Sequence, residues 1–221
     1  MPLIRTQEHT TLDHVFNLHD LSKKIYNEEE IKHFDIMEAI NTHPLAKRPT
    51  SLRSKLAYRE LITNLKPTPK YLLPGQLVCF YYSNPKYKEE LDYYDATPLT
   101  LFLGIIRTKD GVIREIGLNL HYYPPFARSR ILLQTYNAFR PYFQKYFNDP
   151  SSKPNTFISY TALNHIMKAN QKLAFGIKMY IPVLRGKSYL VPTRLIPTAF
   201  YTEGHFAKAT LANVYHFWRQ F

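Results

Sequence analysis

The segment 99–123 constrains the fold more than any other, because it contains two strand-like runs joined by a turn with a strict conformational requirement. Residues 99–107 and 112–123 are rich in Leu, Ile and Tyr, which are common in strands. Between them stands Thr108-Lys109-Asp110-Gly111, and an Asp-Gly pair accepts the positive φ angles of a tight hairpin turn. The pattern predicts two antiparallel neighbouring strands, the second of them bent near Gly117.

Three further strands are expected. Pro74-Gly75 begins a turn that leads into a strand at 77–82. Near the C-terminal end, 175–183 and 188–196 have the composition of strands, and Arg185-Gly186-Lys187 lies between them as a turn. We expect a small antiparallel β barrel or a curled sheet, formed by the strand at 77–82 and the two strands on either side of Asp110-Gly111.

Helical spacing of apolar residues predicts helices on both sides of these strands. Ser51 and Ser159 are expected N-caps, and Pro141 is expected to break the helix that follows Pro124-Pro125. The predicted fold class is α+β, with helices packed on the sheet and a helical N-terminal extension. We place that extension at 1–66 and the α+β core domain at 67–221. The expected helices are two before residue 42, then 51–65, 124–147, 160–171 and 204–221.

The charge is unevenly distributed along the chain. The 221 residues contain 29 Lys and Arg and 17 Asp and Glu, for a net charge of +12. Residues 1–40 carry −4, residues 41–70 carry +6, and residues 151–221 carry +8 with Glu203 as their one acid. Two basic blocks of this kind predict contact with a polyanion such as nucleic acid.

Other classes of protein are excluded or disfavoured. A single cysteine, Cys79, rules out an intrachain disulfide, and on a strand we expect it to be buried and inert. The longest apolar stretches fall far short of the ~20 residues that a membrane helix needs, and the N-terminus lacks the apolar centre of a signal peptide. We therefore expect no membrane contact and a protein of the cytoplasm or of a particle assembled there.

No pattern predicts catalysis. The seven glycines are scattered, so no phosphate-cradling loop is present. His14 and His19 are five residues apart and do not share a helix face. A metal-dependent nuclease would need clustered carboxylates, and a solvated loop explains the available acids better. We predict no catalytic residue, no metal and no cofactor. The acids considered are Glu89, Glu90, Asp92, Asp95 and Glu115.

The candidate contact residues are cations and aromatics. Adjacent strand residues point to opposite faces, so each tyrosine pair should have one ring in the core and one at the surface. Aromatics among Arg and Lys stack nucleic-acid bases or anchor protein interfaces, and we favour the interface. Trp218 is expected to lie either in an interface with another subunit or in the core of its own chain. The predicted DNA or partner contacts are Lys47, Arg48, Arg53, Lys55, Arg59, Arg128, Arg130, Arg194 and Lys208, and the predicted interface residues are Tyr81, Tyr82, Tyr93, Tyr94 and Trp218.

Several segments occur in an order that is similar to one known family. Pro74-Gly75-Gln76 is followed by Tyr94-Asp95-x-x-Pro98-Leu99, and then by Gly117-Leu118-Asn119-Leu120-His121-Tyr122-Tyr123-Pro124-Pro125. Arg128 with Leu132-Leu133 comes next, and Phe206-Ala207-Lys208-Ala209-Thr210 with Val214-Tyr215 lies near the end. This order resembles the DNA end protector and head-completion proteins of T-even-like tailed phages and their marine-phage relatives.

The resemblance covers about half of the chain and implies a minor structural virion protein that shields packaged genome ends at the head–tail connection. Its partners would be portal, neck or tail subunits and genome-end DNA, with several copies in a symmetric assembly. The implied location is the virion, and the host cytoplasm during assembly. The resemblance implies no enzyme. The alternatives are a free, sequence-nonspecific DNA-binding protein and a metal-dependent nuclease. In the signature, Asn119 and His121 are expected to bond the backbone, while Arg128 and Arg130 project outward.

Overall fold

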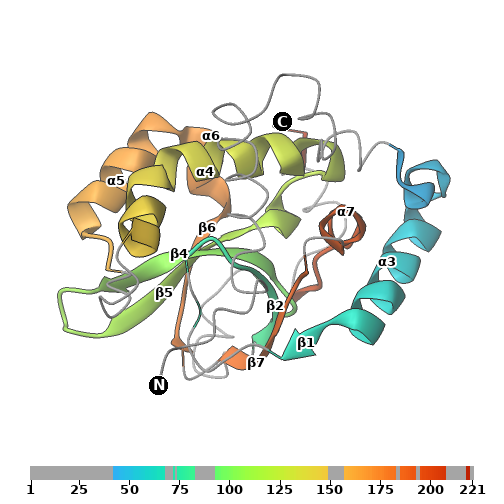
Figure 1. Ribbon diagram of the computed structural model, residues 1–221, viewed down its shortest axis with the longest axis horizontal. Helices are drawn as coiled ribbons and strands as arrows, with labels where there is room; N and C mark the ends of the chain where they lie inside the picture. The colour runs from blue at the N-terminus through green and yellow to red at the C-terminus, as the bar shows by residue number, and fades with distance from the viewer. Residues whose placement is uncertain are drawn as a thin grey trace.

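The computed structural model describes residues 42–67, 72, 74–82, 93–148, 157–182, 185–192, 195–207 and 218–219. The two helices predicted before residue 42 lie outside these ranges. The described part is an α+β structure in which one antiparallel sheet is covered by helices (Figure 1). The fold class predicted from the sequence is therefore confirmed.

The main sheet has six strands in the order β1-β7-β2-β4-β5-β6, and every neighbouring pair is antiparallel. A second sheet pairs β3 (Tyr94–Asp95) with β8 (Phe206–Ala207). The sheet does not close into a barrel, since β1 and β6 form its two edges. The six strands are β1 (Lys66–Pro67), β2 (Leu77–Tyr82), β4 (Leu99–Arg107), β5 (Ile113–Asn119), β6 (Ile177–Tyr180) and β7 (Arg185–Leu190).

The hairpin between β4 and β5 is confirmed. Gly111 has a φ of 78°, and its N–H donates to the carbonyl of Thr108 at 2.9 Å. The second strand is shorter than predicted and ends at Asn119. The Asn119 side chain accepts the N–H of His121 and begins a 3-10 turn, η4 (Leu120–Tyr122). A side chain that bonds the nearby backbone competes with the strand ladder, which explains the early end.

Contacts across the sheet show that it is strongly curled. Tyr180 on the edge strand β6 lies 5.2 Å, between ring centroids, from both Phe80 and Tyr82 on β2. Two strands separate β6 from β2 in the sheet order. Arg185 on β7 likewise reaches Glu115 on β5, with nitrogen–oxygen distances of 2.8 and 3.1 Å. Of the two predicted forms, the curled sheet is thus correct.

The turn predicted at Arg185-Gly186-Lys187 is wrong, because these three residues are the first of strand β7. Strand β7 begins at Arg185 and pairs with β2, whereas β6 pairs with β5. Long-range packing decides this arrangement, because Tyr180 is buried among the aromatics of β2 and Arg185 binds Glu115. Local turn propensity carries no information about either contact.

Helices cover one face of the sheet and one end of it (Figure 1). Pro141 lies within α4 without ending the helix. It is exposed, so the carbonyl group that loses its helical hydrogen bond at Pro141 is on the solvent side of the helix. Ser159 caps α5 as predicted, but Asn170 interrupts the helix expected at 160–171. The helices are α3 (Thr50–Asn64), α4 (Pro125–Asn148), α5 (Tyr160–Ala169), α6 (Gln171–Gly176) and α7 (Ile196–Ala199), with the 3-10 helix η3 (Pro44–Lys47) before α3.

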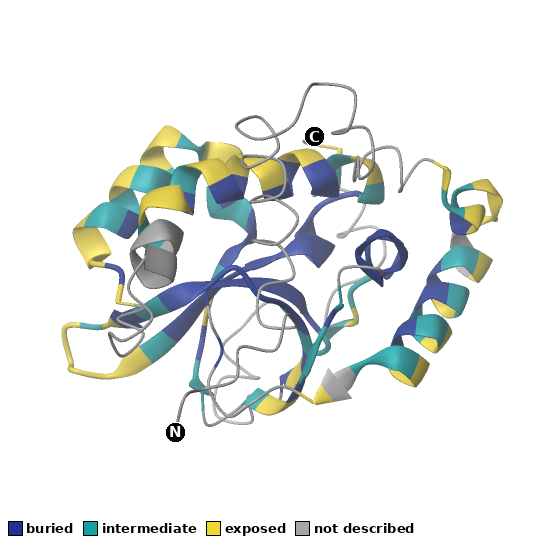
Figure 2. Ribbon diagram, in the orientation of Figure 1, coloured by how far each residue is buried: buried dark blue, intermediate teal, exposed yellow. Residues whose placement is uncertain are grey.

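Two hydrophobic clusters lie on opposite faces of the sheet. The larger one fills the space between the sheet and the helices and includes Leu101, Leu118 and Phe139 (Figure 2). Ala57 and Leu61 of α3 belong to it, so α3 shares a core with the sheet, and the predicted boundary at residue 66 stays a prediction. The smaller cluster lines the other face of the sheet and consists of Leu72, Val78, Phe80, Tyr82, Phe102 and Tyr180.

Two remaining predictions concern Cys79 and the C-terminal helix. Burial raises the pKa of the Cys79 thiol to about 12, which keeps it protonated and unreactive. The helix predicted to begin at Gly204 is wrong at its start, because Phe206–Ala207 form β8 against β3. Residues 208–217 lie outside the described ranges.

Candidate nucleic-acid interface

Three residues of the sequence signature, Asp95, Asn119 and His121, meet in one buried polar cluster where β3, the end of β5 and residues 199–205 come together. Asp95 is its centre. One carboxylate oxygen accepts hydrogen bonds from His121 Nδ1 at 2.7 Å and from Asn119 Nδ2 at 3.0 Å. The other accepts the backbone N–H groups of Thr97 and His205, both at 3.1 Å. The carboxylate thus joins three segments that are far apart in the sequence.

Burial and hydrogen bonding set the charges in this cluster. Burial raises the pKa of Asp95, but the hydrogen bonds that it accepts from His121, Asn119 and Thr97 outweigh this effect and bring the pKa below its ordinary value. Burial also lowers the pKa of His121, against the attraction of Asp95. Near neutral pH the carboxylate is therefore ionised and the imidazole is neutral, with its Nδ1 hydrogen directed at Asp95.

The order Asp95, His121 and Thr202 is that of a nucleophilic triad, since His121 Nε2 lies 2.9 Å from the Thr202 hydroxyl. All three side chains are buried, however, with His121 and Thr202 each only 1% exposed. A nucleophile must reach its substrate, so we interpret the cluster as structural. The prediction that Asn119 bonds the backbone is confirmed, because its Oδ1 accepts the N–H of His121. The same prediction for His121 is wrong, because its side chain bonds the side chains of Asp95 and Thr202.

Arg128 belongs to the same buried region, and its predicted contact with DNA is wrong. Its guanidinium donates to the carbonyl oxygens of Tyr123 at 2.9 Å and of Phe200 and Thr202 at 2.6 Å each. Burial lowers its pKa to about 10, which leaves it charged at neutral pH. Arg128 precedes the buried Ile131 and Leu132 by three and four residues, and this spacing places it on the inner face of α4. The helical period could have revealed this.

The tyrosine pairs follow the predicted pattern only where they lie on a long strand. On β2, Tyr81 is 58% exposed and Tyr82 only 6%, as expected from alternation. Tyr122 and Tyr123 are both buried, because they lie in η4 and in the corner after it. Their predicted division into core and surface rings is wrong. Tyr93 and Tyr94 are both half-buried.

Tyr93 contributes to a group of rings beside the polar cluster. Its ring centroid lies 6.1 Å from that of Tyr122 and 6.3 Å from that of Phe206. Lys178 Nζ lies 4.1 Å from the centre of the Tyr122 ring, and burial lowers the pKa of this lysine to about 8. Trp218 is half-buried and donates to the carbonyl of His121 at 3.4 Å. A contact of Trp218 with another subunit stays a prediction.

The first basic block forms a surface on η3 and α3. Lys47, Arg48, Lys55 and Arg59 are exposed. Arg53 is half-buried, and its guanidinium carbon lies 5.1 Å from the centre of the Tyr201 ring. We call the four exposed cations the α3 basic face. Two further predicted contacts, Arg194 and Lys208, lie outside the described residues.

The α3 basic face is held in place by contacts on the inner side of the helix. The hydroxyl of Ser54 accepts the N–H of Glu203 at 3.2 Å. The Tyr58 ring stacks on His205 with centroids 5.1 Å apart, and its hydroxyl donates to the carbonyl of Glu203. The helix therefore presents Lys55 and Arg59 from a fixed support.

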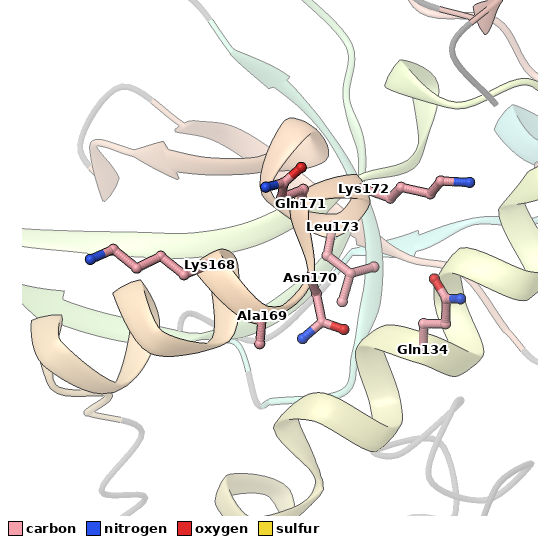
Figure 3. A pocket seen from close by; sticks show the side chains of 7 residues that line it. All are labelled: Gln134, Lys168, Ala169, Asn170, Gln171, Lys172 and Leu173. Carbon is pink, nitrogen blue, oxygen red and sulfur yellow. The ribbon is translucent and has the colours of Figure 1, made fainter.

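A second surface contains one predicted contact, Arg130, and two cations that the sequence analysis missed, Lys168 and Lys172. The helices α4, α5 and α6 contain no Asp or Glu. Arg130, Lys168 and Lys172 are exposed on them. Figure 3 shows a pocket of about 370 Å³ between α4 and the α5–α6 corner. Its lining residues are Gln134, Lys168, Ala169, Asn170, Gln171, Lys172 and Leu173.

Acidic residues do not gather into a metal centre in the described part of the chain. Asp95 is occupied by its hydrogen bonds and Glu115 by Arg185. Among the residues that the structure describes, no group of three or more His, Cys, Asp and Glu side chains could hold a metal ion. Glu89, Glu90 and Asp92 fall outside those residues. In the same part of the chain, no helix is both long and apolar enough to cross a membrane.

Comparison with known proteins identifies the family. The family described as phage T4 terminal DNA protecting protein matches residues 24–183, which is well over half of the chain and includes every signature segment except the one at 206–215. No curated protein and no solved structure matches the chain. The match confirms the resemblance to DNA end protectors that the signature indicated. The chain belongs to the phage T4 terminal DNA protecting protein family.

Proposed function

We propose that this protein binds the ends of a linear phage genome and shields them from degradation, as a minor structural protein of the virion. The family match over residues 24–183 is the observation that carries the proposal. The net charge of +12 supports it, because neutralising phosphates and releasing their counterions drives binding to DNA. The proposed role is structural, not enzymatic.

The α3 basic face is the proposed place of DNA contact among the predicted residues. Lys55 and Arg59 are four residues apart on one side of α3 and are both exposed, so they can meet phosphates of one strand together. Lys47 and Arg48 extend the same basic surface beyond the start of the helix. Contacts of this kind position a protein on DNA without reading its sequence.

We further propose that the protein sits at the head–tail connection of the particle and contacts portal, neck or tail subunits there in several copies. Tyr81, exposed on β2, supports this as an interface residue, because tyrosine is enriched where proteins meet. The net charge of −4 on residues 1–40 is complementary to the basic remainder of a neighbouring copy. Such a protein would be found in the virion, and in the host cytoplasm during assembly.

Exonuclease digestion tests the end-shielding function. A linear duplex should become resistant to an exonuclease that enters from ends when the purified full chain is added, while an endonuclease should still cut the interior. The K55Q/R59Q variant should give weaker protection, because two proposed phosphate contacts are removed. If the wild type leaves ends as sensitive as bare DNA, the end-shielding function is wrong.

A DNA-binding protein that acts free in the cytoplasm is the second candidate, and the same exposed cations favour it. Counting copies in purified particles separates the two. A virion protein should be present in a fixed, low number of copies per particle, whereas a free protein should be lost during purification.

A further inference from the structure

The outer surface formed by α4, α5 and α6 is unusually poor in negative charge. Between Glu115 and Glu203 the sequence has one acidic residue, Asp149, and eleven Lys and Arg. None of the three helices contains an acid. Their outward positions are exposed in Figure 2, and Arg130, Lys168 and Lys172 are among them. A phosphate approaching this surface therefore meets no carboxylate from the helices themselves.

The pocket between these helices adds shape to the charge. Its volume is about 370 Å³ and it is open to solvent, so a phosphate of DNA can approach its lining residues from outside. In Figure 3, Lys168 and Lys172 leave the α5–α6 corner on opposite sides of the pocket, and Gln134 faces the corner from α4. Each ammonium is carried on a flexible four-carbon stem and can turn toward a bound anion. The amides of Gln134 and Gln171 offer neutral donors between them.

The corner that carries the lysines is rigid. Asn170 ends α5 by donating from both its backbone N–H and its Nδ2 to the carbonyl of Ile166, each at 3.0 Å. The Tyr123 hydroxyl donates to the carbonyl of Lys172 at 2.8 Å and accepts the N–H of Gly176 at 2.9 Å. Leu173 is completely buried beneath the pocket. The backbone positions of both lysines are thus fixed before a ligand arrives, which lowers the entropic cost of binding.

From this geometry we propose that the pocket binds a phosphate group of DNA, either the terminal phosphate or one within the backbone, and that the outer surface of α4, α5 and α6 is a second DNA-contact surface. The proposal rests on the proposed function for the choice of DNA as the polyanion. Both this surface and the α3 basic face then contact the same end of the DNA duplex.

Removing both pocket lysines tests the proposal. The K168Q/K172Q variant of the full chain is compared with wild type for binding to three DNAs: a linear duplex with 5′-phosphate ends, the same duplex with 5′-hydroxyl ends, and a covalently closed circle. We expect its affinity to fall about tenfold or more, because two cations that would neutralise phosphate and release counterions are lost. A loss confined to the 5′-phosphate duplex identifies a terminal phosphate, and an equal loss on all three DNAs identifies a backbone phosphate.

Two control variants make the comparison specific. R107Q/K109Q removes the same charge from exposed positions of the β4–β5 hairpin and should bind DNA nearly as wild type. K168R/K172R keeps the charge and should restore binding. Thermal unfolding of each variant verifies that it is folded, and exposed substitutions of this kind change stability by only about 0.5 kcal/mol.

The outcomes separate this proposal from the proposed function. If K168Q/K172Q binds all three DNAs as tightly as R107Q/K109Q does, the pocket does not bind DNA phosphate and the proposal is wrong. If that variant binds DNA normally but no longer enters particles, the surface docks an acidic protein, which also contradicts the proposal. If the wild type itself does not distinguish linear from closed DNA, end recognition fails whatever the pocket variant does.

Discussion

Arg128 and Arg130 are two residues apart in α4 and belong to two different regions of the molecule. Arg128 lies in the buried polar cluster, where three carbonyl oxygens accept its hydrogen bonds. Arg130 lies on the acid-free outer surface of the helices. The sequence signature runs mainly through the first region, while the proposed DNA contacts lie on exposed surfaces, which are the α3 basic face and the outer surface of α4, α5 and α6. Residues of the family signature therefore stabilise the fold, and exposed cations make the proposed contacts with DNA.

The largest expected effect concerns this pair of arginines. Arg128→Ala should lower the free energy of unfolding by about 3–5 kcal/mol, because the buried carbonyls of Tyr123, Phe200 and Thr202 lose their donor and each unsatisfied buried acceptor costs about 1–3 kcal/mol. Urea denaturation of the purified variants measures the change. Arg130→Ala is the matched control and should stay within about 0.5 kcal/mol of wild type; equal losses for both would break the distinction between the two regions.

Two glycines test the same contrast between the packed interior and the surface, with a smaller expected change in stability. A Cβ on Gly176 would lie 2.3 Å from Tyr123 Cε2 in the interior, whereas a Cβ on Gly111 would meet no atom within 4 Å. Gly176→Ala should cost about 1–3 kcal/mol through overpacking. Gly111→Ala should cost about 1 kcal/mol, because its φ of +78° is unfavourable for alanine. Thermal unfolding of both variants should rank them in this order, and the reverse order would contradict the packing at Tyr123.

The pH dependence of stability sharpens the description of the buried cluster. The pKa of His121 is lowered from 6.5 by burial, so the unfolded chain binds a proton at this site more readily than the folded chain. Stability should therefore fall as the pH drops below about 6.5. Asp95, whose pKa is lowered from 3.8, adds a second loss of the same sign at still lower pH.

Denaturation between pH 7 and pH 5 measures the histidine contribution. His121→Gln should flatten the loss of stability in this window. His43→Gln is the comparison outside the cluster, because burial also lowers the pKa of His43, and it should remove only the part of the loss that His43 itself contributes. A slope that depends on His43 and not on His121 would mean that His121 is charged in the folded protein.

Local chemistry explains which parts of the fold could be predicted from the sequence. Asp110-Gly111 determines the hairpin through its own φ angles, and Ser159 caps its helix through one nearby hydrogen bond. The partners of β6 and β7 could not be predicted in this way, because they depend on Tyr180 and Arg185 contacting strands far away in the sequence.

The candidate site was predictable to a similar degree. The exposed cations of α3 follow from helical spacing and charge. The interior position of Arg128 was missed because a charged residue is rarely fully buried, although its helical spacing pointed inward. The pocket at the α5–α6 corner depends on the interruption at Asn170, and a continuous helix was expected there.

Mapping where a DNA end contacts the protein is the most direct test of the two proposed DNA-contact surfaces. A linear duplex with a photoreactive group at its 5′ terminus is bound to the full chain, cross-linked, and the modified peptides are identified by mass spectrometry. We expect cross-links on the α3 basic face and around Lys168 and Lys172. We expect none on peptides whose side chains are buried around Asp95 and Arg128. Cross-links that concentrate on the rings of Tyr93 and Phe206 beside Lys178, with none on α3, α5 or α6, would contradict this expectation.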